Sequence, residues 1–175
     1  MKFEQLAELV KNDDVIGLSR HVDSPAIKGL DINGRSLLFL AAAANATDAG
    51  LYLIDTAKLD VNGLENGGES ALMRAASQGN VALAKGLLEA GADLQQVSPI
   101  TGGTALHAAY AGGQKATAAV AALLEAGADT SALDKQGRAP AEWAAEGQAI
   151  DKAAEFLVGG EVVNPPRRRG PGMGR

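Results

Sequence analysis

The side chains that could do chemistry in this sequence are few and scattered. It has two histidines, His21 and His107, and no cysteine, which excludes thiolate and disulfide chemistry. His21 stands near Asp13, Asp14 and Asp23, but a metal site would require these groups to converge. We interpret His21 as part of a solvated helix end. The adjacent acids Asp13 and Asp14 are typical of a helix N-cap and first turn, where carboxylates favour the helix dipole.

A glycine-rich stretch, AGGQKAT at 111–117, has some of the residues of a phosphate-binding loop. That loop needs a lysine directly after its last glycine and a strand before its first one. Here Gln114 separates Gly113 from Lys115, and helical patterns lie on both sides. We interpret the stretch as an elongated break between two helices. Since no Ser/His/Asp set stands out either, we predict that the chain is not an enzyme and binds no cofactor or metal.

The elements that position side chains in this chain come from an internal repeat. The seven residues LLEAGAD occur at 87–93 and again at 123–129, 36 residues apart. Upstream of each copy lies the pattern Gly-x-(Ser/Thr)-Ala-Leu-x-x-Ala. It can be anchored at Ser36, Ser70, Thr104 and Ala139, spaced by 34, 34 and 35 residues, and more loosely at Glu4. Such self-similarity indicates about five units that stack on one another.

Each unit has the pattern of two short helices and a turn. A hydroxyl residue precedes the first helix of three units, as an N-cap would. In the second helix, apolar residues recur at helical spacing, and we expect Leu88 and Leu124 to lie at cores between units. Gly91 and Gly127 follow as helix ends, while Gly68, Gly102 and Gly137 fit tight turns between units. Helices this short are unstable alone, so stacking must supply the core.

At this point the residues resemble a known family. The sequence TALHAA at 104–109, followed by Gly113 and by LLEAGAD, resembles the ankyrin repeat, with its T-P-L-H-x-A, its glycine after the first helix and its closing L-L-x-x-G-A-D. The match spans roughly Glu4 to Val158 and is strongest in the units anchored at Ser70 and Thr104. Departures are clear: the proline of the motif survives only as Pro140, and the first unit lacks the turn residues.

The resemblance implies an all-α ankyrin-repeat solenoid of about five helix-turn-helix units with short hairpin-like turns. It implies that His107 bonds the backbone of a neighbouring turn. Trp143, the only tryptophan, could anchor a partner, since tryptophan is common at binding hot spots. We favour packing against the stack, because ankyrin repeats often place a large apolar residue there.

We predict one domain over residues 1–160, with units at about 1–30, 31–64, 65–98, 99–133 and 134–160. Residues 161–175 are expected to form a disordered tail rich in proline, arginine and glycine. Its three adjacent arginines are a weak signal for nucleic acid or anionic lipid. The longest apolar runs, 37–44 and 116–124, fall short of the ~20 residues that a membrane span needs.

Composition limits the partners. The hydrophobic fraction of 46% and charged fraction of 21% are those of a globular chain. The net charge is −5, and four arginines lie in the last eleven residues, which leaves −9 on residues 1–164. That charge disfavours nucleic acid and favours a protein partner with a basic face. The start of the chain has no secretion signal, so we expect a cytoplasmic protein, or a periplasmic one if a signal peptide was removed.

Repeat solenoids bind partners on the concave side formed by turns and first helices. We therefore expect a protein-binding adaptor or inhibitor, without a small-molecule substrate. Similar small bacterial ankyrin proteins suggest a toxin-immunity factor; the alternatives are an accessory subunit of an enzyme, such as an oxidative-stress enzyme, or a secreted effector. The predicted contact residues at the turn tips are Asn33, Arg35, Asn66, Glu69, Ile100, Thr101, Lys135, Gln136 and Arg138. Those on first helices are Arg74, Ser77, Gln78 and Tyr110.

Overall fold

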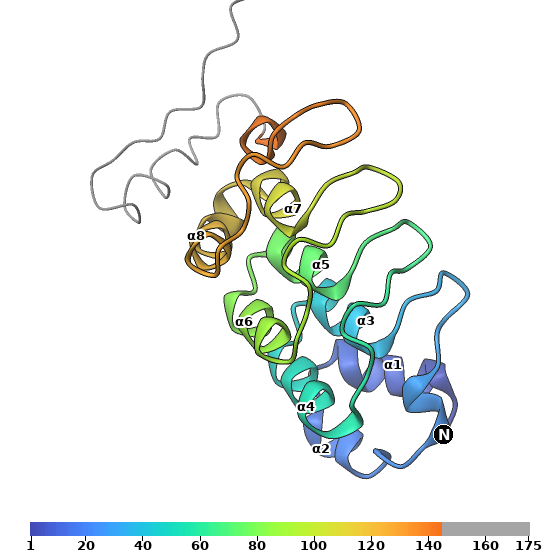
Figure 1. The fold of residues 1–175 in the computed structure, drawn as a ribbon. Coiled ribbons are helices and arrows are strands. Elements are labelled where there is room, and N and C mark those ends of the chain that lie inside the picture. Colours follow the sequence, from blue (N-terminus) through green and yellow to red (C-terminus); the bar gives the residue numbers. More distant parts are fainter. Residues whose placement is uncertain (145–175) are drawn as a thin grey trace, which may run out of the picture.

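The described part of the molecule is a row of helix pairs. A computed structural model describes residues 1–144 (Figure 1). The first helices of the pairs are α1 (Phe3–Lys11), α3 (Leu37–Ala44), α5 (Ala71–Gln78) and α7 (Ala105–Ala111). The second helices are α2 (Val15–Ser19), α4 (Thr47–Ala57), α6 (Val81–Glu89) and α8 (Thr117–Glu125). Three short 3-10 segments complete it: η1 (Pro25–Lys28), η2 (Gly113–Ala116) and η3 (Pro140–Trp143).

The helices form two rows, and the loops between units project to one side. Figure 1 shows α3, α5 and α7 in one row and α4, α6 and α8 in the other, with four loops extending away from the helices. We call these loops fingers 1 to 4, comprising residues 30–36, 64–70, 97–104 and 133–139. Within residues 1–144 there is no strand, only an isolated bridge between Leu64 and Ser70. The predicted all-α solenoid is therefore confirmed.

The predicted division into units extends beyond the described residues. The last predicted unit, 134–160, is described only as far as residue 144. The remainder of that unit and the predicted tail, 161–175, lie outside the described residues.

The first helices begin where the repeat pattern places a hydroxyl. The Ser36 Oγ accepts a hydrogen bond from the Phe39 N–H at 3.1 Å, and the Ser70 Oγ accepts one from the Met73 N–H at 3.2 Å. These bonds satisfy amide groups that a helix start leaves without a partner. Ala139 has no hydroxyl at the same position. Its unit begins instead with a 3-10 turn, η3, in which the Glu142 carboxylate accepts the Ala139 N–H at 2.6 Å.

The second helices α6 and α8 end as the sequence predicts. Gly91 and Gly127 have φ angles of 92° and 90°, in the left-handed region that glycine adopts without a Cβ penalty. The Ala92 N–H donates to the Leu87 carbonyl and the Ala128 N–H to the Leu123 carbonyl, which closes both helix ends at 2.9 Å. The stretch 111–117 contains η2, so its interpretation as a break between two helices is also correct.

The core runs through the whole row, but one leucine pair was assigned to the wrong position. Leu87 and Leu123 are fully buried, whereas Leu88 and Leu124 are half-buried at the edge of the stack. Neighbouring residues of a helix point about 100° apart, so only one leucine of each pair can face directly into the core. The expectation that Leu88 and Leu124 carry the core between units is therefore corrected to Leu87 and Leu123.

Adjacent second helices approach closely because small residues lie between them. A Cβ atom on Gly50 of α4 would lie 2.6 Å from the Leu83 Cδ1 of α6, and one on Gly86 of α6 would collide with Leu51 of α4. Contacts this short do not occur between real side chains. The glycines therefore set how tightly α4 and α6 pack.

The adjacent acids of the first unit act at two different helices. The Asp14 carboxylate accepts the Gly17 N–H at 2.8 Å and caps α2. The Asp13 carboxylate accepts the N–H groups of Asp48 and Ala49, at 3.4 and 2.6 Å, and so caps α4 of the next unit. The predicted role as helix-start acids is confirmed, and Asp13 also ties the first unit to the second.

Candidate functional site

Each finger is a closed turn with its own backbone hydrogen bond. The first residue of the turn donates its N–H to a carbonyl near the end: Asp31 to Arg35 at 3.1 Å, Glu65 to Glu69 at 3.0 Å, Ser98 to Gly103 at 2.9 Å and Asp134 to Arg138 at 2.9 Å. The predicted glycines Gly68, Gly102 and Gly137 have positive φ in fingers 2, 3 and 4. The tips that carry the predicted contact residues are therefore ordered before any partner arrives.

Fingers 1 and 4 hold their arginines by the same carboxylate arrangement. Asp31 accepts the Arg35 N–H at 2.9 Å and its Nε–H at 2.7 Å, and Asp134 does the same for Arg138 at 2.8 Å in both cases. The arginine side chains keep 37% and 47% of their surface exposed. Arg35 and Arg138 are among the predicted contact residues. Both are already paired with an acid of their own finger, which limits the charge that they can offer to a partner.

Asp134 is the most strongly bound acid in the described residues. Besides Arg138, it accepts the Gln136 N–H at 2.9 Å and the Trp143 indole N–H at 2.7 Å. Burial alone raises the pKa of Asp134. The hydrogen bonds from the Arg138 backbone, the Trp143 indole, the Arg138 side chain and the Gln136 backbone outweigh this and hold the pKa well below its usual range. The carboxylate is therefore an ordering element of finger 4.

Finger 2 offers a different pair, Glu69 with Arg74 of α5. The Arg74 guanidinium forms an ion pair with the Glu69 carboxylate and lies 5.4 Å from the centre of the Phe39 ring. The Arg74 Nε atom is buried and has no hydrogen-bond partner among the described residues. Ser77 lies one turn further along α5, where its hydroxyl donates to the Arg74 carbonyl at 3.0 Å. Glu69, Arg74 and Ser77, all predicted contact residues, are thus brought together.

A second aromatic contact joins α7 to finger 4 and η3. The Trp143 ring packs edge-on against His107, with centroids 5.1 Å apart, and the Arg138 guanidinium lies 5.4 Å from the Trp143 ring centre. Trp143 and Arg74 both stand four residues after the repeat anchor of their units. Trp143 packs against the stack, as favoured from the sequence.

His107 joins a helix to the next finger, as the family resemblance implies. Its Nδ1 accepts the Thr104 N–H at 3.1 Å, so the ring proton belongs on Nε2, which donates to the Arg138 carbonyl at 3.1 Å. Burial lowers the pKa of His107, against the opposing effect of its bond to Arg138. The neutral imidazole is therefore the structural form.

Neighbouring finger tips are linked directly. The Asn66 N–H donates to the Asn33 carbonyl at 2.9 Å, and the Lys135 N–H donates to the Thr101 carbonyl at 3.0 Å. The remaining first-helix contact residue, Gln78, accepts a hydrogen bond from the Lys115 ammonium at 2.8 Å. The predicted tip residues thus belong to linked pairs of fingers.

Tyr110 does not belong to the exposed set. It is only 8% exposed, although the sequence analysis placed it among accessible first-helix residues. In the repeat frame it corresponds to Ala42 and Ala76, which are both fully buried. The residue one position later is exposed at Ala43 and Ala111 and half-buried at Ser77. The expectation that Tyr110 is available to a partner is corrected by this burial.

Apolar residues of the fingers were missed by the sequence analysis. Leu30, Val97 and Leu133 are 61%, 53% and 58% exposed, and each directly precedes the first turn residue of its finger. Leu64 occupies the same position in finger 2 and is half-buried. Ile32 is 94% exposed. The signal was present in the repeat frame, where four equivalent positions all carry leucine or valine.

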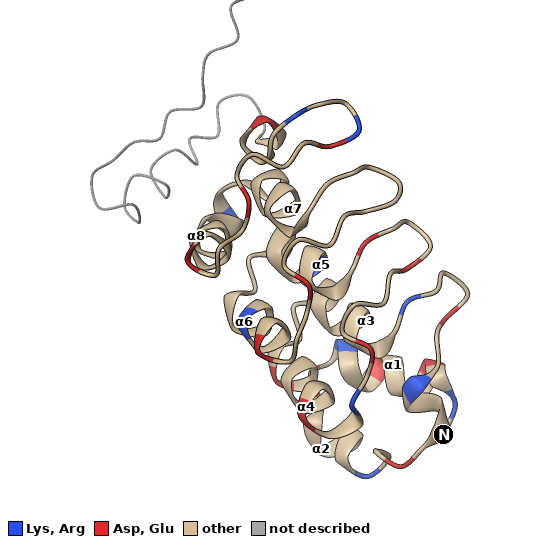
Figure 2. Cartoon of the chain, in the orientation of Figure 1, with Lys and Arg blue, Asp and Glu red and all other residues tan. Residues whose placement is uncertain are grey.

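The negative charge lies away from the fingers. The second helices with their flanking loops, residues 13–29, 46–63, 80–96 and 117–132, hold ten acids and four bases, a net charge of −6. The rest of residues 1–144 holds seven acids and seven bases. Figure 2 shows acidic residues along the loops that follow α4, α6 and α8. The first helices and fingers together are therefore neutral, and the net negative charge of residues 1–144 lies on the second helices and their loops.

Residues 1–144 can also be considered for metal binding and for membrane spanning. No group of three or more His, Cys, Asp or Glu side chains there could hold a metal ion. None of the helices in the same range is long and apolar enough to cross a bilayer.

A comparison with protein families gives one match. A family model described as ankyrin repeats, in three copies, matches residues 7–98. The matched range extends from α1 to finger 3 and includes fingers 1 and 2, with Arg35, Glu69 and Arg74.

Proposed function

Because the chain belongs to the ankyrin repeat family, whose members are generally protein–protein interaction modules and usually non-catalytic, we propose that it binds one partner protein as an adaptor or inhibitor. The contact surface consists of the fingers and the exposed face of the first helices. Roles in toxin immunity, as an accessory subunit of an enzyme or as a secreted effector are narrower versions of this proposal that depend on the partner.

One observation carries the proposal: the finger surface is ordered by its own hydrogen bonds. Turn residues are held by Asp31, Glu65, Ser98 and Asp134, and neighbouring tips are linked through Asn66 and Lys135. A surface that is rigid before binding loses little conformational entropy when a partner arrives. The exposed apolar residues Leu30, Ile32 and Val97 add surface that a partner can bury.

Charge enters the proposal through the rate of association. The acids that would attract a basic partner lie on the second helices, while the finger surface is neutral. We therefore propose that the acids raise the association rate of a basic partner, while contacts at the finger surface determine how slowly the complex dissociates.

The test begins with capture of a partner by the full-length chain and its identification by mass spectrometry. Two variants then locate the contact: Asn33→Glu with Gln136→Glu at the finger tips, and Lys85→Glu with Glu89→Lys on α6. Both pairs are exposed. Arg35, Glu69 and Arg138 are unsuitable because reversing them would break ion pairs within the protein.

We expect the finger variant to weaken binding at least tenfold and the α6 variant to change the affinity less than twofold, with equal melting temperatures. Loss of binding in the α6 variant alone would place the contact on the second helices. Substrate turnover that depends on His21 would contradict a non-catalytic role.

A further inference from the structure

Side-chain amides connect successive units at the base of the fingers. The Asn62 Oδ1 accepts the Asp93 N–H at 2.7 Å, and its Nδ2 donates to the Gly91 carbonyl at 3.3 Å. Gln95 repeats the pattern one unit later, with the Asp129 N–H at 3.4 Å and the Gly127 carbonyl at 3.1 Å. In each case an amide residue of one unit fastens the end of the second helix in the next unit.

A further amide reinforces the junction between the second and third units. The Gln96 Nε2 donates to the Asn62 carbonyl at 2.7 Å. Three side chains thus fill the space between the loops that lead into successive fingers.

The junction between the first and second units lacks these bonds. In the repeat frame Lys28 corresponds to Asn62 and Gln95, and Gly63 corresponds to Gln96. An ammonium group cannot accept a hydrogen bond, and glycine has no side chain to reach back. Among the described residues, the Asp60 N–H, which corresponds to the fastened Asp93 and Asp129, has no hydrogen-bond acceptor.

An open groove of about 370 Å³ lies at this junction. Its apolar lining comprises Ile27, Leu30, Phe39, Leu59 and Leu64. Ile27 and Phe39 are buried, while Leu30 is 61% exposed. The groove is large enough for one or two apolar side chains of a partner.

Four charged side chains line the groove, two lysines and two acids. Lys28 and Lys58 line it, are exposed, and have no ion-pair or hydrogen-bond partner within residues 1–144. The two acids in the lining are engaged with backbone: Asp60 accepts the Asn62 N–H at 2.9 Å and Glu65 accepts the Glu69 N–H at 3.2 Å. The groove therefore offers two ammonium groups and the Asp60 N–H as donors to a carboxylate, beside two acids that each accept one backbone N–H.

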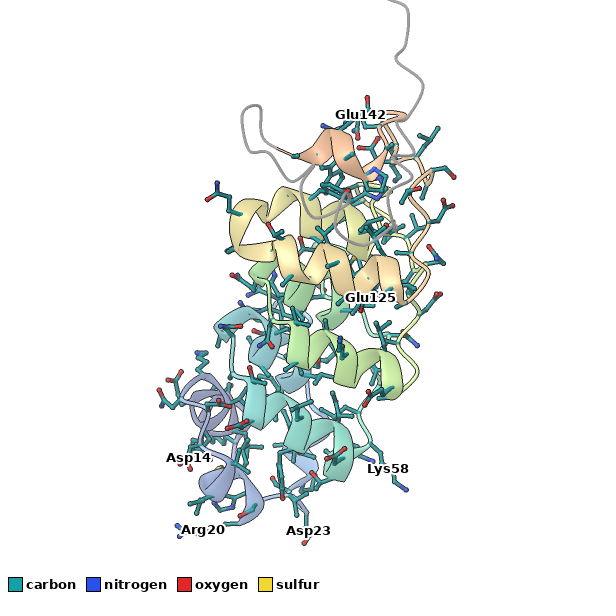
Figure 3. All side chains as sticks on the ribbon, turned by 90° about the vertical axis from the view of Figure 1, so that its left-hand side faces the viewer. Asp14, Arg20, Asp23, Lys58, Glu125 and Glu142 are labelled. Atoms are coloured by element: carbon teal, nitrogen blue, oxygen red, sulfur yellow. The ribbon has the colours of Figure 1, made fainter. Side chains whose placement is uncertain are left out.

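Lys58 occupies its position at a conformational cost. Its φ is 47°, and the corresponding residues in the next two units are Gly91 and Gly127. A side chain in the left-handed region is strained, because its Cβ atom lies too close to the following carbonyl oxygen. Figure 3 shows the Lys58 side chain extending away from the end of α4.

We propose that this groove binds an extended segment of the partner protein in which a large apolar residue stands next to an Asp or Glu. The apolar side chain enters between Leu30 and Leu64, and the carboxylate pairs with Lys28 and Lys58. The proposal rests on the proposed function and adds a contact at the base of the first two fingers. A local carboxylate is compatible with a basic partner, because long-range attraction follows the summed charge.

The test uses synthetic peptides, so that it does not depend on the identity of the partner. The full-length chain, labelled with ¹⁵N, is titrated with Gly-Ser-Leu-Glu-Val-Ser-Gly and with two matched peptides, one with Lys in place of Glu and one with Ser in place of both Leu and Val. We expect saturable chemical-shift changes at Gly29, Asp60 and Gly63 with the first peptide, and binding at least threefold weaker with the other two.

Two variants test the contributions of the lysine charges and of the open groove. Lys28→Ser with Lys58→Ser should weaken the first peptide about three- to tenfold, since exposed ion pairs each contribute modestly. Lys28→Asn with Gly63→Gln restores the amides of the later junctions, and it should raise the melting temperature and abolish binding. Lys85→Ser, on α6 outside the groove, is the control and should bind as the original chain does.

Three results would overturn the groove assignment: equal binding of the Lys-containing peptide, shifts confined to the first helices, or undiminished binding by the double serine variant. None of them would affect partner binding at the finger tips. Conversely, a partner insensitive to Asn33→Glu with Gln136→Glu would overturn the finger surface and leave the peptide result standing.

Discussion

At the level of single residues, His107 makes both of its backbone hydrogen bonds only in its neutral form. Its Nδ1 accepts a backbone N–H from Thr104 while its Nε2 donates to the Arg138 carbonyl. A protonated ring would present a proton to the Thr104 N–H, so that bond would be lost while the bond to the Arg138 carbonyl would remain. Burial lowers the pKa of His107, so folding favours the neutral ring.

This lowered pKa predicts a pH dependence of stability. The unfolded chain takes up the proton near pH 6.5, whereas the folded chain does so only at lower pH. The stabilising contribution is complete above pH 6.5 and is lost as the pH falls through the folded pKa, by at most about 1.4 kcal/mol per pH unit. His107→Gln keeps a donor without titrating, so its melting temperature should fall less than that of the original chain between pH 7.5 and 5. An equal fall in melting temperature for the variant and the original chain would contradict this prediction.

Paired leucines allow a second prediction at this scale. Leu87→Ala removes a fully buried side chain and should lower the free energy of unfolding by about 2–5 kcal/mol. Leu88→Ala, on the half-buried neighbour, should cost roughly half as much. Urea denaturation of both variants would measure the difference, and an equal loss would contradict the assigned burial.

The sequence allowed the roles of some residues to be predicted but not their pairing. The roles of Ser36 and Ser70 follow from local spacing and that of His107 from the family resemblance, and all three were predicted correctly. Tyr110 was misplaced because its exposure depends on a rotation of one residue around a short helix. The ion pairs of Arg35 and Arg138 depend on how long side chains fold back on their own turn, which a repeat pattern does not encode.

At the level of elements, helix ends differ in strain although they share one pattern. Gly91 and Gly127 end α6 and α8 in the left-handed region, where Lys58 ends α4 with a Cβ atom. Lys58→Gly should therefore raise the free energy of unfolding by about 1 kcal/mol. Gly91→Ala is the matched change in the opposite direction, because a Cβ there would meet no other atom within 4 Å and only the backbone would be strained. Urea denaturation would measure both changes, and a stabilising Gly91→Ala would contradict the argument.

Element boundaries followed the sequence most closely where the repeat was regular. The starts of α3, α5 and α7 lie directly after Ser36, Ser70 and Thr104. The boundaries of the first unit and of η3 differ more from the repeat pattern, because Glu4 and Ala139 have no hydroxyl that could cap a helix. The fingers were predicted as turns, but the apolar residue that begins each finger was not predicted to be exposed. The sequence pattern does not distinguish an exposed leucine from a buried one.

At the level of the whole molecule, the net charge and the proposed contact lie on different surfaces. The second helices and their loops carry the net −6, and the fingers with the first helices are neutral. Glu89→Lys with Glu125→Lys should therefore slow the association of a basic partner roughly several-fold at low salt and leave its dissociation rate unchanged. Surface plasmon resonance at two salt concentrations measures both rates. A change in the dissociation rate would place these acids within the contact.

The period of the sequence was sufficient to predict the stack, but the interrupted junction was not predicted. The repeat frame aligns Lys28 with Asn62, but the frame alone does not reveal that the Asn62 side chain bonds to the next unit. In the structure, the junction that lacks the amide bonds is also the junction where the groove lies.

The attachment of the first unit determines how that unit can move. Asp13 ties it to the start of α4, whereas at the other end of α4, beside Lys58, the amide bridge of later units is absent. In a repeat array each unit is held only by its neighbours, so the weakest junction opens first. We expect amide hydrogens of α1 to exchange with solvent faster than those of α5. A segment bound in the groove would contact both units and slow this exchange. The exchange rate of the α1 amides would then report how much of the protein has the groove filled.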